Sequence, residues 1–576
     1  MRTAGILLPA FSTRRCGDLG IGDTMGIRSW VDWASRFHVG FLQLLPINEN
    51  GTDESPYSAI SSAALDPIYL SIEPGEIPCL TQEDIDATRA ILGDRLGADQ
   101  VDYPAVRAAK NRLLEISFSR FSAKPSASCE EDFSAFRKTH QSWLPDYCLF
   151  KLLIELNPPG QTWDLWPEEH RTPESARKFL KKPSEENPLH TQSRLDYFAY
   201  VQWLCFQQWT ALRLYADQKN VKLMGDIPIG VSFHSSDVFF NREVFHTDWF
   251  GGTAAEGFCP ENPFIHEWGQ NWGIPLYNWQ AMEKNGFAWW RARIAHLTEI
   301  FSIFRIDHIL GFYRIYGFPW HPRRNHEYIG ISHEEAAAKS QGRLPRWFEH
   351  PDDTQENKAA NRATGNHRLR AILDAAGSAE IIAEDLGWVP EYVRPHLAEL
   401  NIAGYRIPHW DSYADGSPVM GDNLPETSFA AFSTHDHDSI CKIWENCRTA
   451  IRKQREEPSE HNYWASEASA HTLRLLAGFS GIPIAGDNNW PPYSDCIHWR
   501  LIKSLLSAES RYAVLMITDL FALKTRINSP GTSGQANWRL RLDLTAHQTE
   551  EYGRLLSNLI RLSNRHAICD TKATHT

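Results

Sequence analysis

The sequence predicts an α/β fold, a (β/α)8 barrel of the TIM type with large helical and loop insertions. Apolar segments of strand length alternate with helical segments along much of the chain, which is typical of a parallel sheet with crossover helices. Several of these strands end in polar residues, and TIM barrels hold their binding groups at the C-terminal strand ends. The 576 residues allow one large domain or two to three smaller ones. We expect a single barrel over residues 1–576.

The N-terminal part of the chain shows this alternation clearly. Residues 4–9 (AGILLP) are expected to form a strand, followed by a glycine-rich loop and a helix over about 24–37. A second strand is expected over 39–47, before a polar loop that carries Tyr57. Further strands are expected at 221–229, from Ile300 to Asp307, at 379–387, from Phe429 onward and at 512–521.

Three segments interrupt the alternation. Helical periodicity dominates from about residue 81 to 188, which indicates a helical insertion on the barrel. Residues 246–268 contain several glycines and prolines and are expected to form a long loop. Residues 322–366 are polar, charged and weakly periodic, and we expect a surface excursion there.

The composition excludes several classes of protein. Lysine and arginine total 58 against 71 aspartate and glutamate, with no basic block, so nucleic acid and anionic membranes are poor partners. Ten cysteines without a CxxC pair argue against a zinc knuckle or a disulfide scaffold and fit a reducing cytosol. No apolar window is long enough for a membrane span, and AGILLPAF is interpreted as a strand, not as an export signal. We therefore expect a cytoplasmic protein.

A charged pair ends the apolar run that starts at Ile300. In a strand, alternate side chains share a face, so Arg305 and Asp307 are expected to point into the same space. The guanidinium can hold the carboxylate by paired hydrogen bonds, and an oriented, ionised aspartate is a good nucleophile for a sugar carbon. The alternative interpretation is a structural ion pair at a strand end.

Two further carboxylates, Glu384 and Asp436, follow other strands and can meet Asp307 only in a closed barrel. Two carboxylates that flank a glycosidic bond suffice for retaining glycoside chemistry, with one as nucleophile and the other as acid/base. Asp307 suits the nucleophile, and Glu384, which follows apolar residues, suits the acid. Asp436 can support positive charge on the sugar ring.

Alternatives stay open for several of these residues. Asp436 and His435 can instead cap a helix N-terminus, because THDHDS precedes a helical run. Asp226 can be a turn former ahead of Pro228, and Asp385 is interpreted as structural because it alternates to the other face.

The chain resembles the 4-α-glucanotransferases of the amylomaltase and disproportionating-enzyme family, glycoside hydrolase family 77. The similar stretches span residues 4 to 544 in the family's order: AGILLP with GDLGIGD, QLLPIN, SPYSAISSAALDPIYL, LMGDIPIGV, GQNWGIPLYNW, FRIDHILGF, IIAEDLG, STHDHDS, and RINSPGT with ANWRLRL. FRIDHILGF and GQNWGIPLYNW most resemble the cytosolic plant-type disproportionating enzymes. We expect the N-terminal starch-binding modules of those enzymes to be absent here.

The resemblance implies a catalytic (β/α)8 barrel with Asp307 as nucleophile, Glu384 as acid/base and Asp436 as transition-state stabiliser. It implies malto-oligosaccharides and α-glucans as substrates, in maltose and glycogen or starch metabolism, and neither a metal nor an organic cofactor. The helical segment matches a subdomain of the family. The substrate-binding residues implied by the same match are Tyr57, Asp226, Trp272, Arg305, His435 and Asn528.

The chain departs from the family in the loop 246–268. Family members carry a Pro-Pro-Asp-Tyr-Phe-like lid shortly before the GQxWG string, where this chain reads TAAEGFCPENPFIHEW. We expect Phe258 to replace part of that lid. Two other functions remain possible from the sequence: a retaining hydrolase of α-1,4-glucans similar to α-amylase, and a non-catalytic α-glucan-binding protein.

Overall fold

The barrel consists of eight parallel strands that close on themselves. The computed structural model describes residues 2–51, 53–181, 188–255, 262–483, 489–532 and 536–565. The strand order around the barrel is β1-β12-β11-β10-β9-β6-β3-β2. Their bounds are β1 Thr3–Leu7, β2 Phe41–Gln43, β3 Lys222–Ile227, β6 Ile303–Ile306, β9 Glu380–Ala383, β10 Ala403–Arg406, β11 Ser428–Ala431 and β12 Tyr512–Met516. The first and last strands pair in parallel, with Gly5 opposite Val514, and the predicted fold class is confirmed.

The sequence pattern predicts seven of the eight barrel strands, and the exception is β10. Its four residues read Ala-Gly-Tyr-Arg and lack the apolar run that marks a buried strand. Gly404 is required there, because a Cβ atom at this position would lie 2.7 Å from a carboxylate oxygen of Asp385. The sequence signal is therefore weak here, where the buried carboxylate of Asp385, two residues after β9, fills the space beside Gly404.

Several strands are shorter than predicted. The strand expected over 512–521 ends at Met516, and helix α18 (Ile517–Leu520) follows directly. The strand expected from Phe429 onward ends at Ala431, and the one expected over 39–47 covers only Phe41–Gln43. A continuous apolar run is compatible with both a buried strand and a buried helix, so its periodicity does not mark the boundary between them.

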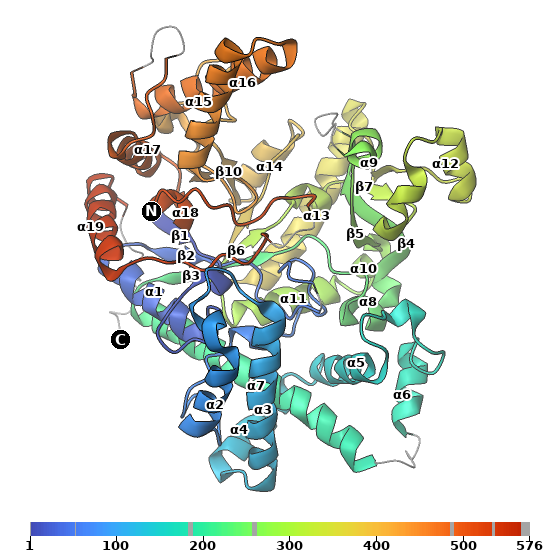
Figure 1. The fold of residues 1–576 in the computed structure, drawn as a ribbon. Helices are drawn as coiled ribbons and strands as arrows, with labels where there is room; N and C mark the ends of the chain where they lie inside the picture. The colour runs from blue at the N-terminus through green and yellow to red at the C-terminus, as the bar shows by residue number, and fades with distance from the viewer. Residues whose placement is uncertain are drawn as a thin grey trace, which may run out of the picture.

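The barrel helices cover the outside of the sheet. They are α1 Thr24–Arg36, α7 Pro188–Gln218, α11 Ala288–Thr298, α13 Gln355–Ala376, α14 Val393–Glu399, α15 Ile440–Glu456, α17 Asp495–Ser507 and α19 Ala546–Leu562 (Figure 1). Helix α16 (Glu460–Ser480) packs on α15 and α17, farther from the strands. Helix α1 starts where predicted, because Asp23 accepts a hydrogen bond from the backbone N–H of Gly26 as its N-cap. None of the described helices combines the length and the apolar character that a membrane span needs.

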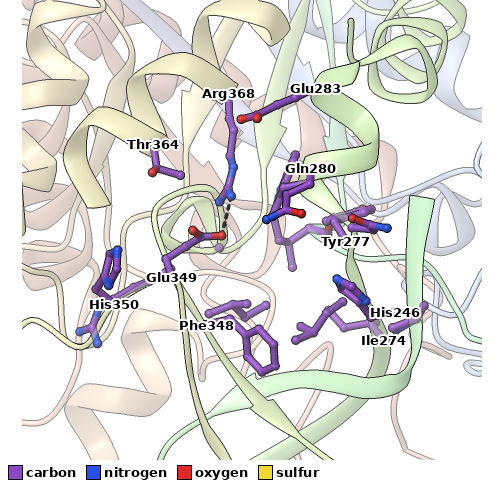
Figure 2. A pocket seen from close by; sticks show the side chains of 18 residues that line it. His246, Ile274, Tyr277, Gln280, Glu283, Phe348, Glu349, His350, Thr364 and Arg368 are labelled. Carbon is purple, nitrogen blue, oxygen red and sulfur yellow. Dashed lines mark hydrogen bonds and ion pairs between the residues drawn. The ribbon is translucent and has the colours of Figure 1, made fainter. Parts of the chain in front are cut away.

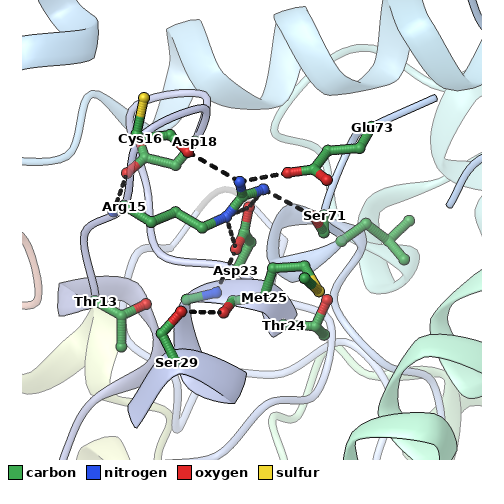
Figure 3. A network of polar contacts seen from close by, with 12 residues as sticks. Thr13, Arg15, Cys16, Asp18, Asp23, Thr24, Met25, Ser29, Ser71 and Glu73 are labelled. Atoms are coloured by element: carbon green, nitrogen blue, oxygen red, sulfur yellow. Dashed lines mark hydrogen bonds and ion pairs between the residues drawn. The ribbon is translucent and has the colours of Figure 1, made fainter. Parts of the chain in front are cut away.

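An arginine fixes the loop between β1 and α1. Arg15 donates from Nε and Nη2 to the carboxylate of Asp23 and from Nη2 to Ser71 Oγ at 2.8 Å, and it also pairs with Glu73 (Figure 3). Asp23 is therefore both the N-cap of α1 and the counter-ion of Arg15. This network joins the start of the chain to the segment that follows β2.

Residues 82–181 form helices, as the periodicity predicted. The helices are α2 Gln82–Leu92, α3 Tyr103–Ala123, α4 Ala127–Thr139, α5 Leu144–Leu156 and α6 Pro173–Lys181, and they extend from the lower side of the barrel in Figure 1. Leu113 and Leu153 of this segment are fully buried and belong to the same apolar cluster as the barrel strands. The helical segment therefore shares one core with the barrel.

A four-stranded antiparallel sheet stands beside the barrel, in the order β5-β4-β7-β8. Its strands are β4 Phe245–Thr253, β5 Gln270–Tyr277, β7 Ile315–Phe318 and β8 Arg346–Phe348. The segment 246–268, expected to be a loop, thus contributes most of β4 and the short helix α9 (Pro263–Trp268). Phe258, the expected lid residue, lies outside the described residues.

The segment 322–366 contains more secondary structure than its polar composition indicated. It includes β8, helix α12 (His333–Lys339) and the first half of α13. Aromatic packing fixes its start, because Tyr328 is fully buried and stacks on Trp320 with ring centroids 3.6 Å apart. A few buried aromatic residues thus anchor a segment whose average composition is polar.

A pocket of about 470 Å³ separates this sheet from the barrel helices (Figure 2). Arg368 of α13 reaches into it and pairs with Glu349, which follows β8. The buried guanidinium also lies 4.2 Å above the ring of Trp279, in helix α10 (Trp279–Lys284), and donates to the backbone oxygen of Phe312. These contacts fix the sheet to the barrel. The remaining short helix, α8 (Ser236–Phe240), follows β3.

Candidate active site

A cavity of about 790 Å³ opens at the C-terminal ends of the barrel strands, and we call it the main cavity. Seven of the nine predicted site residues line it: Tyr57, Trp272, Arg305, Asp307, Glu384, Asp436 and Asn528. The other two contact members of this group, because Asp226 binds Arg305 and His435 stacks on Tyr57. The structure thus brings together side chains that are hundreds of residues apart in sequence.

Arg305 lies between two carboxylates. Its Nη1 atom donates to both carboxylate oxygens of Asp226, at 2.7 and 2.8 Å, and its Nη2 atom donates to Asp307 Oδ1 at 2.8 Å. The expected paired hydrogen bonds to Asp307 are therefore wrong, since Asp226 receives the pair. Burial acts to lower the pKa of Arg305, but the charges of Asp226 and Asp307 outweigh it and raise the pKa well above its usual value.

Asp226 is part of this ion-pair network and is not a turn former. It belongs to β3, next to β6 in the barrel, and faces Arg305 directly in the strand register. Its side chain is fully buried and accepts a third hydrogen bond, from the hydroxyl of Tyr57, at 2.7 Å. A buried carboxylate with this many donors is held in one orientation.

Asp307 follows the last residue of β6, and its side chain remains 27 % exposed toward the main cavity. The backbone N–H of Asp307 donates to the carbonyl of Ile227, which continues the parallel ladder one residue past the strand. The chain then turns sharply at His308, which has a φ of 42°. The carboxylate is thus oriented by Arg305 and yet accessible.

Glu384 follows β9, the neighbour of β6, and is almost completely buried. Its two carboxylate oxygens accept the backbone N–H groups of His308 at 2.7 Å and of Leu386 at 2.9 Å. Burial raises the pKa of Glu384 to about 7, and the charge of Asp307 acts in the same direction, whereas Arg305 and the two backbone hydrogen bonds oppose it. A group with this pKa can both give and take a proton near neutral pH.

Asp436 lies in the loop after β11. Asn528 Nδ2 donates to Asp436 Oδ1 at 2.6 Å, and His435 Nε2 lies 3.4 Å from the same oxygen. Burial acts to raise the pKa of Asp436, but the charge of His435 and the hydrogen bond from Asn528 lower it overall. The N-cap alternative is wrong, because α15 begins at Ile440 and Ser439 is its N-cap.

Aromatic rings form one wall of the main cavity. Tyr57 and His435 stack with ring planes 14° apart, and Trp538 lies against both rings. On another side, Trp272 meets His308 edge to face at 4.9 Å. Such rings give the cavity flat apolar surfaces beside its carboxylates, which suits sugar rings.

Several residues that line the main cavity are not among the site residues predicted from the sequence. His308 and Trp538 lie inside the quoted strings FRIDHILGF and ANWRLRL, so the signal for them was present. Trp410 and His437 also line the cavity, and nothing in the local sequence marks Trp410. Asp385 was interpreted as structural, and it is fully buried with ion pairs to Arg394 and Arg406.

Comparison with known proteins agrees with this architecture. The family model described as 4-alpha-glucanotransferase matches residues 8–545. A 4-alpha-glucanotransferase of Chlamydia caviae is 28% identical over 551 residues, covering 93% of this chain and 90% of the relative. One from Thermus thermophilus is 28% identical, covering 98% of this chain and 99% of the relative.

Solved structures show the same fold. Amylomaltase from Streptococcus agalactiae in complex with acarbose superposes with a TM-score of 0.73 at 22% identity, covering 98% of this chain and 100% of that one. Amylomaltase from Corynebacterium glutamicum gives 0.75 at 17% identity, covering 97% and 75%. These four proteins are bacterial, so the likeness to plant-type enzymes stays a prediction. Because the family model spans nearly its whole length, this chain belongs to the 4-α-glucanotransferases of glycoside hydrolase family 77, enzymes that act on α-1,4-glucans.

Proposed function

We propose that this 4-α-glucanotransferase moves glucosyl or maltosyl units by a retaining double displacement, with Asp307 as nucleophile and Glu384 as acid/base. The observation that carries the proposal is the contrast between these two carboxylates. Arg305 orients Asp307 at the edge of the main cavity, whereas burial raises the pKa of Glu384 to about 7. Two carboxyl groups with such different environments suit the two roles of a retaining glycosidase.

In the first half-reaction, Glu384 gives its proton to the glycosidic oxygen as the bond from that oxygen to the anomeric carbon breaks. A carboxylate oxygen of Asp307 forms a bond to the same carbon from the opposite face. The shortened chain leaves with a free 4-hydroxyl, and the donor unit stays on Asp307 as a glycosyl ester. Asp436, held by Asn528, is close enough to the cavity to support the positive charge that develops on the ring.

In the second half-reaction, the carboxylate of Glu384 takes the proton of an incoming 4-hydroxyl. That oxygen attacks the anomeric carbon and releases Asp307 as a carboxylate. Two inversions at one carbon restore the α-configuration. When water enters in place of the sugar, the same steps give hydrolysis, so exclusion of water and binding of the acceptor decide between the two outcomes.

The two possible substrate preferences, plant-type and amylomaltase-type, give different products, so analysis of the product chain lengths distinguishes them. From the resemblance of FRIDHILGF and GQNWGIPLYNW, we propose the plant-type habit, in which maltose donates a glucosyl unit to a branched glucan such as glycogen. The purified protein would be incubated with maltotriose alone, and separately with maltose with and without glycogen. Glucose release from maltose only in the presence of glycogen supports the plant-type habit. Longer chains and glucose from maltotriose alone support the amylomaltase habit.

The same experiment tests transfer itself. Shorter products with a matched rise in reducing ends would favour the α-amylase-like hydrolase, and no turnover of any substrate would favour the non-catalytic glucan-binding protein. We also assign six side chains to substrate binding from their positions at or beside the main cavity: Tyr57, Asp226, Trp272, Arg305, His435 and Asn528.

We also propose that residues 1–576 act as one catalytic unit in the cytoplasm. The single apolar cluster that joins the helical segment 82–181 to the barrel supports one unit. The eight cysteines of the described residues are free thiols, which supports a reducing compartment. Limited proteolysis tests the first point, since cleavage near residues 81 and 188 that leaves an active barrel would contradict it.

A further inference from the structure

A second cavity, of about 730 Å³, adjoins the main cavity and has no part in the chemistry above. We call it the aromatic cavity. It lies between the four-stranded sheet and the loop that follows β9. Four residues line both cavities, namely Gln270, His308, Leu386 and Gly387. Because the two cavities share these residues, a glucan chain bound in the main cavity can extend directly into the aromatic cavity.

The aromatic cavity presents two indole rings. Trp388 follows the shared residue Gly387 and is 72 % exposed, which makes it the most exposed tryptophan of the described residues. Trp347, in the middle of β8, is half-buried and lines the same cavity. A large exposed indole on a loop next to an active site is a surface suited to the apolar face of a sugar ring.

Arg314 holds this surface in place. Its guanidinium carbon lies 3.7 Å from the ring centroid of Trp347 and 5.8 Å from that of Trp388. Arg314 and Asp352 form an ion pair of 2.7 Å in which both side chains are only 5% exposed. Tyr392, which also lines the cavity, donates to Asp352 at 3.1 Å. The Arg314 guanidinium thus has a fixed position before any ligand arrives, close against Trp347 and within reach of Trp388.

The charge of the cavity favours a neutral ligand. Arg314 is the one permanently charged side chain among the described residues that line it, and Asp352 neutralises that charge. Burial lowers the pKa of His308 to about 4, so this imidazole is uncharged at neutral pH. Among the described residues that line the cavity, an anionic or cationic ligand finds no unpaired counter-ion, whereas a glucose chain needs only ring faces and hydrogen-bonding groups.

The short chain segment between Glu384 and Trp388 indicates which side of the bound substrate faces the aromatic cavity. A general acid sits beside the leaving oxygen, on the side of the departing or incoming chain. Leu386, Gly387 and Trp388 lie two to four residues after Glu384, and Leu386 donates its backbone N–H to that carboxylate. The aromatic cavity therefore extends the acceptor side of the main cavity.

We propose that Trp388 and Trp347, held by Arg314, form an additional binding site for distant glucose units of long or branched α-glucan acceptors. The inference rests on the proposed function, since it assigns the acceptor side from the role of Glu384. The site selects for acceptor length, because Asp307 lines the main cavity and not the aromatic cavity, whereas the two rings line only the aromatic cavity. Trp388 and Trp347 are binding residues, and Arg314 is a positioning residue.

The test compares a long and a short acceptor with one donor. Transfer from maltotriose to maltoheptaose, and to isotope-labelled glucose, would be measured for the wild type and for Trp388→Ala. We expect the KM for maltoheptaose to rise about five- to tenfold, as loss of one aromatic contact produces. The KM for glucose and both kcat values should stay within about twofold, the scatter of surface substitutions. Trp388→Phe, which keeps a ring, should recover most of the affinity for maltoheptaose.

A matched control is Trp464→Ala in α16, because that indole is 65% exposed and lies outside both cavities. It should leave both KM values unchanged. Equal effects of Trp388→Ala on the two acceptors, no effect on either, or an effect of Trp464→Ala instead would overturn the inference while the proposed function stands. A wild-type protein without transfer from maltotriose to any acceptor would overturn both.

Discussion

Glu384 accepts the backbone N–H of His308 at 2.7 Å, so the proposed acid/base is bound to the residue next to the proposed nucleophile. The parallel register of β6 and β9 makes this contact possible, because Ile306 and Ala383 are partners at the ends of the two strands. The left-handed backbone of His308 then turns its N–H toward the neighbouring strand end. One turn thus positions both carboxylates of the proposed double displacement.

The raised pKa of Glu384 predicts the alkaline limb of the pH profile. The first half-reaction needs the protonated acid, and burial raises the pKa of this group to about 7. We therefore expect kcat/KM for maltotriose to fall as pH rises through about 7. Glu384→Gln should be slow at every pH and should lose this limb, measured by initial rates from pH 5 to 9. An unchanged limb in that variant would assign the titration to another group.

The substitution Asp226→Asn tests whether the ion pairs of Arg305 with both Asp226 and Asp307 are needed for stability and activity. The substitution leaves Arg305 buried with one carboxylate in place of two, and removal of one partner from a buried ion pair costs about 3–5 kcal/mol. We expect a clear fall in the free energy of unfolding, measured by urea denaturation, together with a loss of activity because Asp307 is no longer fixed.

The control for this substitution is Glu399→Gln, which breaks the exposed pair with Arg362. That change should alter the free energy of unfolding by less than about 1 kcal/mol. If Asp226→Asn were as mild as Glu399→Gln, the ion-pair network would not be what orients Asp307.

Asn528→Ala tests the support of Asp436. The change removes the 2.6 Å hydrogen bond to Asp436 Oδ1, and a hydrogen bond to a charged group contributes about 1.5–3 kcal/mol. We expect kcat/KM for maltotriose to fall about tenfold to a hundredfold with a native circular dichroism spectrum. Asn528→Asp should be worse, because it places a second negative charge beside Asp436. Full activity in both variants would remove Asp436 from the proposed mechanism.

Local signals in the sequence predicted the barrel correctly, and they also led to the proposal of Asp307 and Glu384 as catalytic groups. Arg305 and Asp307 stand at the abrupt end of an apolar run, and Glu384 follows three apolar residues. The pairing of Arg305 with Asp226 could not be predicted in this way. Asp226 is 79 residues away along the chain, and its pairing depends on the register between β3 and β6. Local sequence patterns do not tell which carboxylate accepts hydrogen bonds from Arg305 on both of its oxygens and which on only one.

Other features could not be predicted from the sequence because a few individual residues, and not the average composition of the segment, determine the structure there. The segment 322–366 reads as polar, but Tyr328 and the pair of Arg368 with Glu349 attach it to the rest of the fold. Strand β10 has no apolar run because Gly404 must leave room for the carboxylate of Asp385. Trp388 has no helical or strand periodicity around it, so its place beside the main cavity emerges only from the tertiary structure.

The central claim is that Asp307 carries the glycosyl unit. The most direct test is to trap that ester in Glu384→Gln with α-glucosyl fluoride, whose departing fluoride needs no proton from an acid. Without a base for the second step, the adduct should accumulate, and peptide mass spectrometry should find one added glucosyl residue on Asp307. Asp307→Asn combined with Glu384→Gln should give no adduct. An adduct on another carboxylate, or fluoride release without any adduct, would contradict the assignment of Asp307 as nucleophile.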